Sequence, residues 1–164
     1  MNRRPHFTSP RRRPAPVSRL DTNIGYWVRS ASNEISQALS RRFGDKGVTL
    51  TEWIALRELY DGDLRPTTLA ERLGLTRGAT SKLARRLVGK LLITQEAITE
   101  DGRAQLLSLT GTGRAVVSVL AVHLDQTDKE FFGDLDPRTR TLILSTMRAI
   151  VLRRGLPAVP VDSN

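Results

Sequence analysis

The segment TTLAERLGLTRGATSKLARRL, residues 67–87, has the pattern of two short helices joined by a tight turn. Leu69 and Leu73 lie four residues apart, as they would on one buried face of a helix. Gly74 then interrupts the pattern, and Thr76 has a side chain suited to cap the next helix. This order of helix, turn and helix predicts a helix-turn-helix.

The second helix of this motif has one face for the core and another for a partner. Ala79, Leu83 and Leu87 follow one another at spacings of four and are expected to pack inward. Small and hydroxyl-bearing residues in its first turn would let the helix approach base edges, and its cations would reach guanine edges or phosphates. The residues expected to contact DNA are Thr76, Arg77, Gly78, Thr80, Ser81, Lys82, Arg85 and Arg86. A helical hairpin that only packs would explain the leucines but not these cations.

The net charge of +9 is concentrated in two places. Residues 1–19 contain six arginines and no carboxylate, and residues 65–90 contain seven cations and a single carboxylate, that of Glu71. The rest of the chain is therefore acidic. Such an excess of positive charge in one folded segment indicates a polyanionic partner, with a solvated helix face as the alternative.

The next segment, LLITQEAITEDGRAQLLSLT at residues 91–110, consists of two β-prone runs around an Asp-Gly turn signal. A hairpin placed directly after a recognition helix would form the wing of a winged helix-turn-helix. Arg103, at the predicted tip, could enter a minor groove, where a narrow negative channel attracts guanidinium groups. Asp101 would orient this arginine or would serve only as a turn residue.

Together these motifs resemble the multiple antibiotic resistance regulator (MarR) family of bacterial winged-helix repressors. The resemblance is carried by LAERLGLTRGATSKLARRL at 69–87, Leu92, Ile93, Asp101, Arg103, Ala104 and LTGTG at 109–113. With the flanking helices it covers residues 20–154. The chain departs from the family at Leu91, where glycine is usual, at Gln95, where arginine is common, and at Gly102, where a second wing arginine is frequent.

Signals for helix starts mark the remaining helices. The predicted N-caps are Ser18 with Asp21, Thr49 with Glu52, Thr110, and Asp136 followed by Pro137. The first of them precedes an apolar stripe over residues 20–43, whose members recur at steps of three and four. The stripes of the first and last helices need a partner to cover them.

The expected fold is mainly α, an α+β winged helix-turn-helix flanked by N- and C-terminal helices that form a dimerisation domain. The resemblance implies that the first and the last two helices of two copies intertwine into a homodimer. Two recognition helices would then lie about one DNA turn apart, roughly 34 Å, on a pseudo-palindromic operator. The expected domains are a disordered basic arm at 1–18, dimerisation helices at 19–48 and 111–154, a winged helix-turn-helix domain at 49–110 and a disordered tail at 155–164.

The resemblance also implies regulation by a small molecule. Members of the family usually release DNA when a small, often anionic aromatic ligand enters a crevice between the dimerisation helices and the winged domain. Candidates for lining such a crevice are Tyr26, Trp27, Trp53, Arg57 and His123. The alternative is that the two tryptophans belong to the core and that Arg57 belongs to the surface.

Composition argues against several other functions. With no cysteine and only two histidines, the chain has little with which to hold a metal ion and no thiol chemistry. No apolar run is long enough for a membrane span, so a cytoplasmic protein without a membrane partner is expected. No nucleophile, base and orienting group occur at a plausible spacing, so neither an enzyme nor a cofactor is expected. Gly111 and Gly113 faintly resemble a dinucleotide-binding turn, but Val116 occupies the third glycine position and no βαβ unit surrounds them.

Two functions remain. The first is a ligand-responsive dimeric repressor that binds a pseudo-palindromic operator in double-stranded DNA. The alternative is a nonspecific DNA-binding or protein-interaction winged-helix module, for which the basic N-terminal tail supplies most of the affinity. The tail itself is either an arm that reaches along the DNA or an extension without a role.

Overall fold

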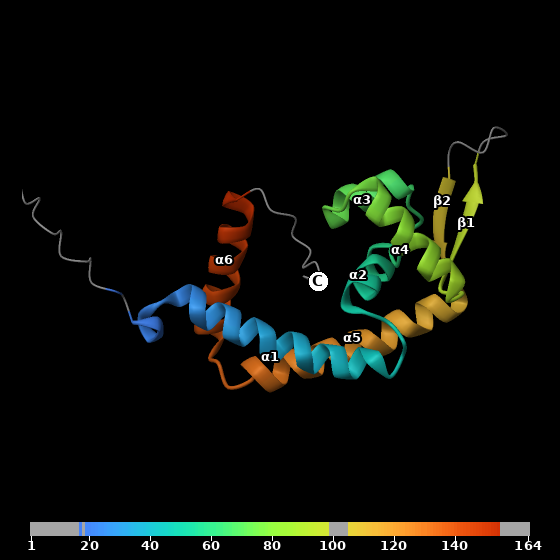
Figure 1. The fold of residues 1–164 in the computed structure, drawn as a ribbon. Helices are drawn as coiled ribbons and strands as arrows, with labels where there is room; N and C mark the ends of the chain where they lie inside the picture. Colours follow the sequence, from blue (N-terminus) through green and yellow to red (C-terminus); the bar gives the residue numbers. More distant parts are fainter. Residues whose placement is uncertain (1–16, 18, 99–104, 155–164) are drawn as a thin grey trace, which may run out of the picture. The chain divides into compact units, whose positions relative to one another are not determined.

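The computed structural model describes residues 17, 19–98 and 105–154. Helices dominate this part of the chain, as expected, and a single hairpin accompanies them (Figure 1). The elements are a 3-10 helix at Leu20–Thr22, α1 (Ile24–Gly44), α2 (Leu50–Glu58), α3 (Pro66–Leu73), α4 (Arg77–Gly89), β1 (Ile93–Ala97), β2 (Gln105–Leu109), α5 (Gly111–Phe132) and α6 (Pro137–Arg153). None of the helices in these ranges combines the length and apolar character that crossing a membrane requires.

The chain divides into two compact units, Met1–Asn33 and Glu34–Asn164. In the first unit, α1 begins later than the expected start of the stripe at residue 20, because the side chain of Asn23 accepts the hydrogen bond of the Tyr26 N–H (3.1 Å). Asp21, one half of the predicted capping box, pairs its carboxylate with the guanidinium of Arg19 at 2.7 Å. Ser18, the other half of that predicted capping box, lies outside the described residues.

The second unit contains the predicted helix-turn-helix. Gly74 ends α3 in the left-handed conformation, with φ of 63°, and the Leu75 N–H donates back to the Ala70 carbonyl (3.0 Å). Glycine suits this position because it has no Cβ to clash in that conformation. The hydroxyl oxygen of Thr76 then accepts the Ala79 N–H at 3.2 Å and starts α4, which confirms the predicted N-cap.

The core side of α4 differs from the predicted one. Ala79 is exposed, and the buried residues are Thr80, Leu83, Ala84 and Leu87. Their spacing of three, four and seven residues is that of a continuous helix face, whereas steps of four alone drift around the helix. Leu83, Ala84 and Leu87 pack in a cluster with side chains from α1, α2, α3, α5 and the strands, among them Phe43, Leu56, Leu69, Leu107 and Leu120.

The two runs around the Asp-Gly signal form the predicted antiparallel hairpin, in which Ile93 pairs with Leu109. The predicted turn, residues 99–104, lies outside the described residues. Leu64, just before α3, forms an isolated β-bridge to β2 that the sequence did not reveal. Its N–H and carbonyl exchange hydrogen bonds with Leu107 of β2 at 3.1 and 2.9 Å, which fixes the start of α3 against the wing.

The junction between α4, β1 and α5 is tightly built. Leu91, which follows α4, has φ of 58°, a left-handed conformation that non-glycine residues rarely adopt. Its carbonyl and that of Leu92 accept hydrogen bonds from the Thr110 hydroxyl at 2.8 and 3.2 Å. Thr110 also caps α5 by accepting the Gly113 N–H, as predicted. The recognition helix, the wing and α5 are therefore joined through a few backbone groups.

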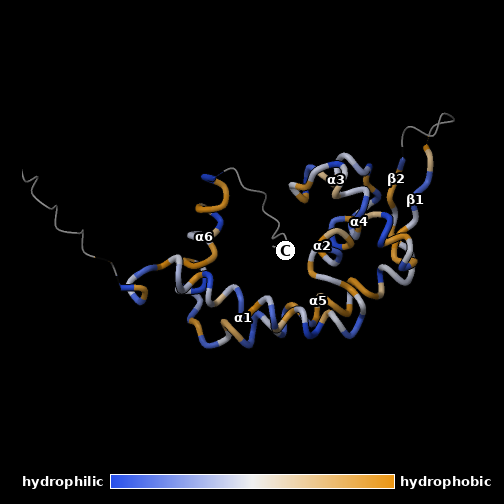
Figure 2. Tube along the Cα trace, in the orientation of Figure 1, coloured by the Kyte–Doolittle hydropathy of each residue, from blue (hydrophilic) through white to orange (hydrophobic). Residues whose placement is uncertain are grey.

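Helix α6 has no buried residue, although it carries an apolar stripe. Its exposed large apolar side chains are Leu142, Ile143, Leu144, Met147, Ile150 and Leu152. In Figure 2, apolar and polar colours alternate along this helix. A helix with such a face is marginal by itself in water, because little apolar surface is removed from solvent.

Candidate nucleic-acid interface

The surface of α4 opposite its core side carries small residues and cations. With four core positions fixed, the helical repeat places Gly78, Lys82 and Arg85 on the opposite face, and Ser81 beside them. All four are exposed. The side chains of Arg77 and Lys82 have no carboxylate partner among the described residues, so their charges are free to meet an external anion.

Thr80 does not belong to this surface. Only 1% of the residue is exposed, and its hydroxyl is buried with no hydrogen-bond partner in the described part of the chain. The prediction that Thr80 contacts DNA is therefore wrong, because it packs beside Leu83 and Ala84 toward the core. The error follows directly from the shifted core face, which turned Ala79 outward and Thr80 inward.

Arg86 is tied to the protein by an interaction that the sequence did not reveal. Its Nε lies 3.6 Å from Oε1 of Glu52, a carboxylate on the first turn of α2 that is only 2% exposed. Lys90, at the end of α4, lies 2.7 Å from Oε2 of the same carboxylate. The last turn of the recognition helix thus directs two of its cations toward a buried anion.

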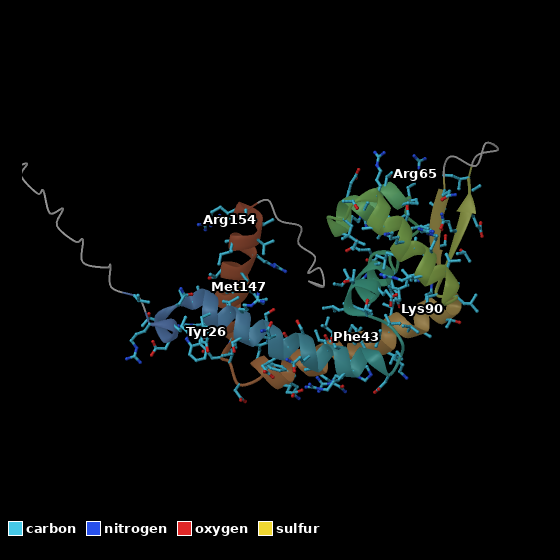
Figure 3. All side chains as sticks on the ribbon, viewed as in Figure 1. Tyr26, Phe43, Arg65, Lys90, Met147 and Arg154 are labelled. Carbon is cyan, nitrogen blue, oxygen red and sulfur yellow. The ribbon has the colours of Figure 1, made fainter. Side chains whose placement is uncertain are left out.

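Arg65 is a candidate contact that the motif analysis missed. It directly precedes Pro66 at the start of α3, and it is exposed (Figure 3). Its side chain makes no cap for α3 and has no ion pair within the described ranges. The pairing of the preceding Leu64 with β2 holds its backbone in place. The excess of cations over residues 65–90 was the only sequence signal for it.

The two strands of the wing lead to the remaining residues predicted to contact DNA. Asp101 and Arg103 both lie outside the described residues, so only the strands that lead to them are placed. Those strands are connected to the helix-turn-helix on both sides, through Leu64 and through Leu92. Any side chain at the tip would therefore be carried by a hairpin fixed to the same unit as α4.

Three of the predicted ligand residues, Trp53, Arg57 and His123, belong to the second unit. Trp53 is a core residue, as the alternative reading had it, since its ring packs 5.8 Å from that of Phe43 and its indole N–H donates to the Val117 carbonyl (3.4 Å). Arg57 lies on the surface, where its guanidinium pairs with Asp61 at 2.8 Å. His123 is half-buried on α5.

The other two predicted ligand residues belong to the first unit. Tyr26 and Trp27 are exposed and contact each other edge to face, with ring centroids 5.3 Å apart. The Trp27 indole donates to the Asp21 carbonyl at 2.9 Å. An apolar cavity of about 190 Å³ does occur in the second unit between α5 and α6, but its walls include Phe132, Ile143 and Met147 rather than any of the five candidates.

Comparison with known proteins gives a family and a fold. A model of the MarR family matches residues 46–104, which span the helix-turn-helix and most of the wing segment. Comparison with curated protein sequences gives no match. Solved structures, in contrast, match the chain over most of its length.

Three of these structures illustrate the likeness. BpsR of Bordetella bronchiseptica has a TM-score of 0.72 at 21% identity, over 82% of this chain and 97% of that one. A probable transcriptional regulator from Pseudomonas aeruginosa has a TM-score of 0.66 at 27% identity, over 82% of this chain and 98% of that one. MepR of Staphylococcus aureus, solved as a DNA complex, has a TM-score of 0.72 at 22% identity, over 80% of this chain and 98% of that one.

A cationic second helix, a hairpin wing and this set of structural matches define the winged helix-turn-helix fold. Within that fold class, the family model that matches residues 46–104 is that of the MarR family. Over these residues the chain is similar to the MarR family.

Proposed function

We propose that this protein is a dimeric repressor that inserts α4 into the major groove of a pseudo-palindromic operator. The observation that carries the proposal is the surface of α4, where Gly78 allows close approach and Lys82 and Arg85 project away from the core. Arginine and lysine read guanine edges or bind phosphates, and a small residue between them lets the backbone come near the bases.

The proposed contacts follow from exposure and charge. Base edges would be read from the first two turns of α4, and Arg65 would bind a phosphate beside the wing. The wing would add a minor-groove contact. The proposed DNA-binding residues are Arg65, Thr76, Arg77, Gly78, Ser81, Lys82, Arg85, Asp101 and Arg103.

Dimerisation would be supplied by segments 19–48 and 111–154. The exposed apolar side chains of α6 support this assignment, because a monomer leaves them in water. A two-fold axis would bring both recognition helices to one side of the DNA.

We further propose that a small anionic aromatic molecule lowers the affinity for DNA. The support is the likeness to BpsR, whose DNA binding is regulated by 6-hydroxynicotinic acid. Two predicted ligand residues of the second unit lie outside its core and could contact such a molecule. They are Arg57, an exposed cation, and His123, a half-buried imidazole.

The proposal is tested by fluorescence anisotropy with a labelled fragment of the protein's own upstream region and with scrambled DNA, at two salt concentrations. A preference of roughly a thousandfold or more that persists at the higher salt supports a specific repressor. Lys82→Ala should remove much of it, whereas Arg138→Ala, an exposed cation on α6, serves as the matched control. If deletion of residues 1–18 abolishes nearly all binding, the tail-driven nonspecific module is favoured instead.

A further inference from the structure

A buried carboxylate anchors the end of the recognition helix. Glu52 lies on the first turn of α2, and both of its oxygens face cations of α4, Lys90 at 2.7 Å and Arg86 at 3.6 Å. The same carboxylate accepts the N–H of Thr49 at 3.0 Å, as the reciprocal half of the predicted capping box. One acidic side chain therefore does two tasks, of which the sequence reveals only the first.

Lys90 extends the connection to a third segment. Its ammonium group also donates to the carbonyl of Gly47, at 2.7 Å, in the turn that joins α1 to α2. The C-terminal end of α4 is thereby bonded to the start of α2 and to the chain that leaves α1 at Gly44. Figure 3 labels Lys90 in this region of the second unit.

The chemistry of this connection favours a geometric role. Burying a charge costs desolvation, and the Glu52 carboxylate is only 2% exposed while the Lys90 side chain is 37% exposed. An apolar contact of similar size would therefore give comparable stability. An ion pair with fixed partners, however, holds two elements in one arrangement, since any other arrangement leaves the buried carboxylate uncompensated. The cations involved are also ones that the exposed face of α4 does not use.

We propose that Glu52 and Lys90 are positioning residues that fix the direction of the recognition helix relative to the C-terminal part of α1, and so set the half-site spacing that the dimer accepts. This consequence for spacing rests on the proposed function. The 13 residues of α4 extend about 20 Å from their anchored end. A rotation of roughly 10° about that end would move the reading turn by about 3.5 Å, close to the rise of one base pair.

The position of α4 can be measured without DNA. The chain has no cysteine, so Ser40→Cys on α1 and Ser81→Cys on α4, both exposed, accept spin labels at defined sites. Double electron–electron resonance then measures the distribution of distances between the two spin labels. Diluting the labelled full-length protein with unlabelled protein restricts the signal to pairs within one chain. Lys90→Gln is expected to broaden this distribution or shift it by about 3 Å, whereas Lys90→Arg retains the cation and keeps it narrow.

Two further variants keep the test decisive. Glu52→Gln with Lys90→Gln removes both charges together, so it avoids an unpaired buried ion while still removing the ionic link. It should broaden the distribution as Lys90→Gln does. Arg72→Gln is the matched control, because it breaks the exposed pair of Arg72 and Glu58 (3.1 Å) on neighbouring helices. An unchanged distribution in both Lys90→Gln and the double variant would overturn the proposal, whatever happens to the melting temperature.

The consequence for DNA is tested separately. The upstream fragment and versions with one base pair inserted or deleted between the half-sites are compared by anisotropy. Wild type and Lys90→Arg should discriminate between spacings, and Lys90→Gln should flatten that discrimination. If wild type binds no fragment specifically, the proposed function fails while the distance measurement still decides the role of Lys90. A broadened distribution with unchanged discrimination would overturn the assignment of spacing.

Discussion

The carbonyl oxygen of Leu92 lies where it leaves no room for a side chain at Gly113: a Cβ atom there would stand 2.1 Å from it. The first turn of α5 therefore packs directly on the backbone that enters the wing. Glycine is required here for close approach and not for an unusual backbone angle.

Gly113→Ala should lower the free energy of unfolding by about 1–3 kcal/mol, because backbone rather than a flexible side chain must move. Urea denaturation measures the change. Gly111→Ala, two residues earlier in the same helix, would meet nothing within 4 Å and is the control. Equal effects of the two substitutions would contradict the steric explanation.

Leu91→Gly should raise the stability by about 0.5–1 kcal/mol, because Leu91 holds a left-handed conformation that costs a non-glycine residue energy. Its side chain is 73% exposed, so little packing is lost. Leu91→Asn should fall between the two, since asparagine tolerates this conformation better than leucine does. Chemical denaturation of the three proteins gives the order, and a glycine variant less stable than wild type would refute it.

Thr80→Val should stabilise the fold by about 1 kcal/mol, since it replaces a buried hydroxyl that has no hydrogen-bond partner among the described residues with a methyl group of the same shape. Its affinity for DNA should stay at the wild-type level, in contrast to that of Lys82→Ala. Denaturation and anisotropy on both variants are the measurements. If Thr80→Val lost operator binding while its fold stayed intact, Thr80 would have to contact DNA after all.

The start of α6 should depend on pH. Hydrogen bonds from the Thr139 side chain and backbone and from the Arg138 backbone lower the pKa of Asp136, because they favour its ionised form. The native state therefore binds fewer protons than the unfolded chain, and the stabilisation is present above roughly pH 4 and disappears as the pH falls through the lowered pKa. Circular dichroism as a function of pH measures the loss of helix in acid. This loss should be smaller in Asp136→Ala than in wild type, and unchanged in the control Asp134→Asn.

Leu144→Glu should convert the proposed dimer into monomers, because it places a charge in the exposed apolar stripe of α6. Thr146→Glu lies nearly opposite Leu144 on the helix and should leave the mass unchanged. Sedimentation of both variants measures the assembly. A dimeric Leu144→Glu protein would place the interface elsewhere.

Local chemistry explains which features could be predicted from the sequence. Thr49, Thr76 and Thr110 cap helices as expected, because a cap depends on residues three positions apart. The core face of α4 was misassigned, since Ala79 and Thr80 are both small and Leu83 and Leu87 fit either choice. Residues 34–44 bury only part of the predicted first stripe.

Contacts between distant segments could not be predicted. Glu52 and Lys90 are 38 residues apart, and Leu64 pairs with a strand 43 residues later, so no periodicity in the sequence relates them. Arg86 was predicted to contact DNA and Lys90 was counted only in the cationic segment, whereas the fold places both near the Glu52 carboxylate. The composition of the segment thus indicated the partner of the helix but overstated the number of cations available to it.

The different surroundings of the two tryptophans give the protein an internal optical reporter. Trp53 is 8% exposed inside the core of the second unit, and Trp27 is 55% exposed in the first. Aqueous quenchers therefore reach one indole and not the other, and the shielded emission follows the packing of Phe43 and Val117 around Trp53. In a Trp27→Phe variant, the fluorescence of Trp53 would report on the winged-helix core during unfolding, DNA binding and the addition of small molecules.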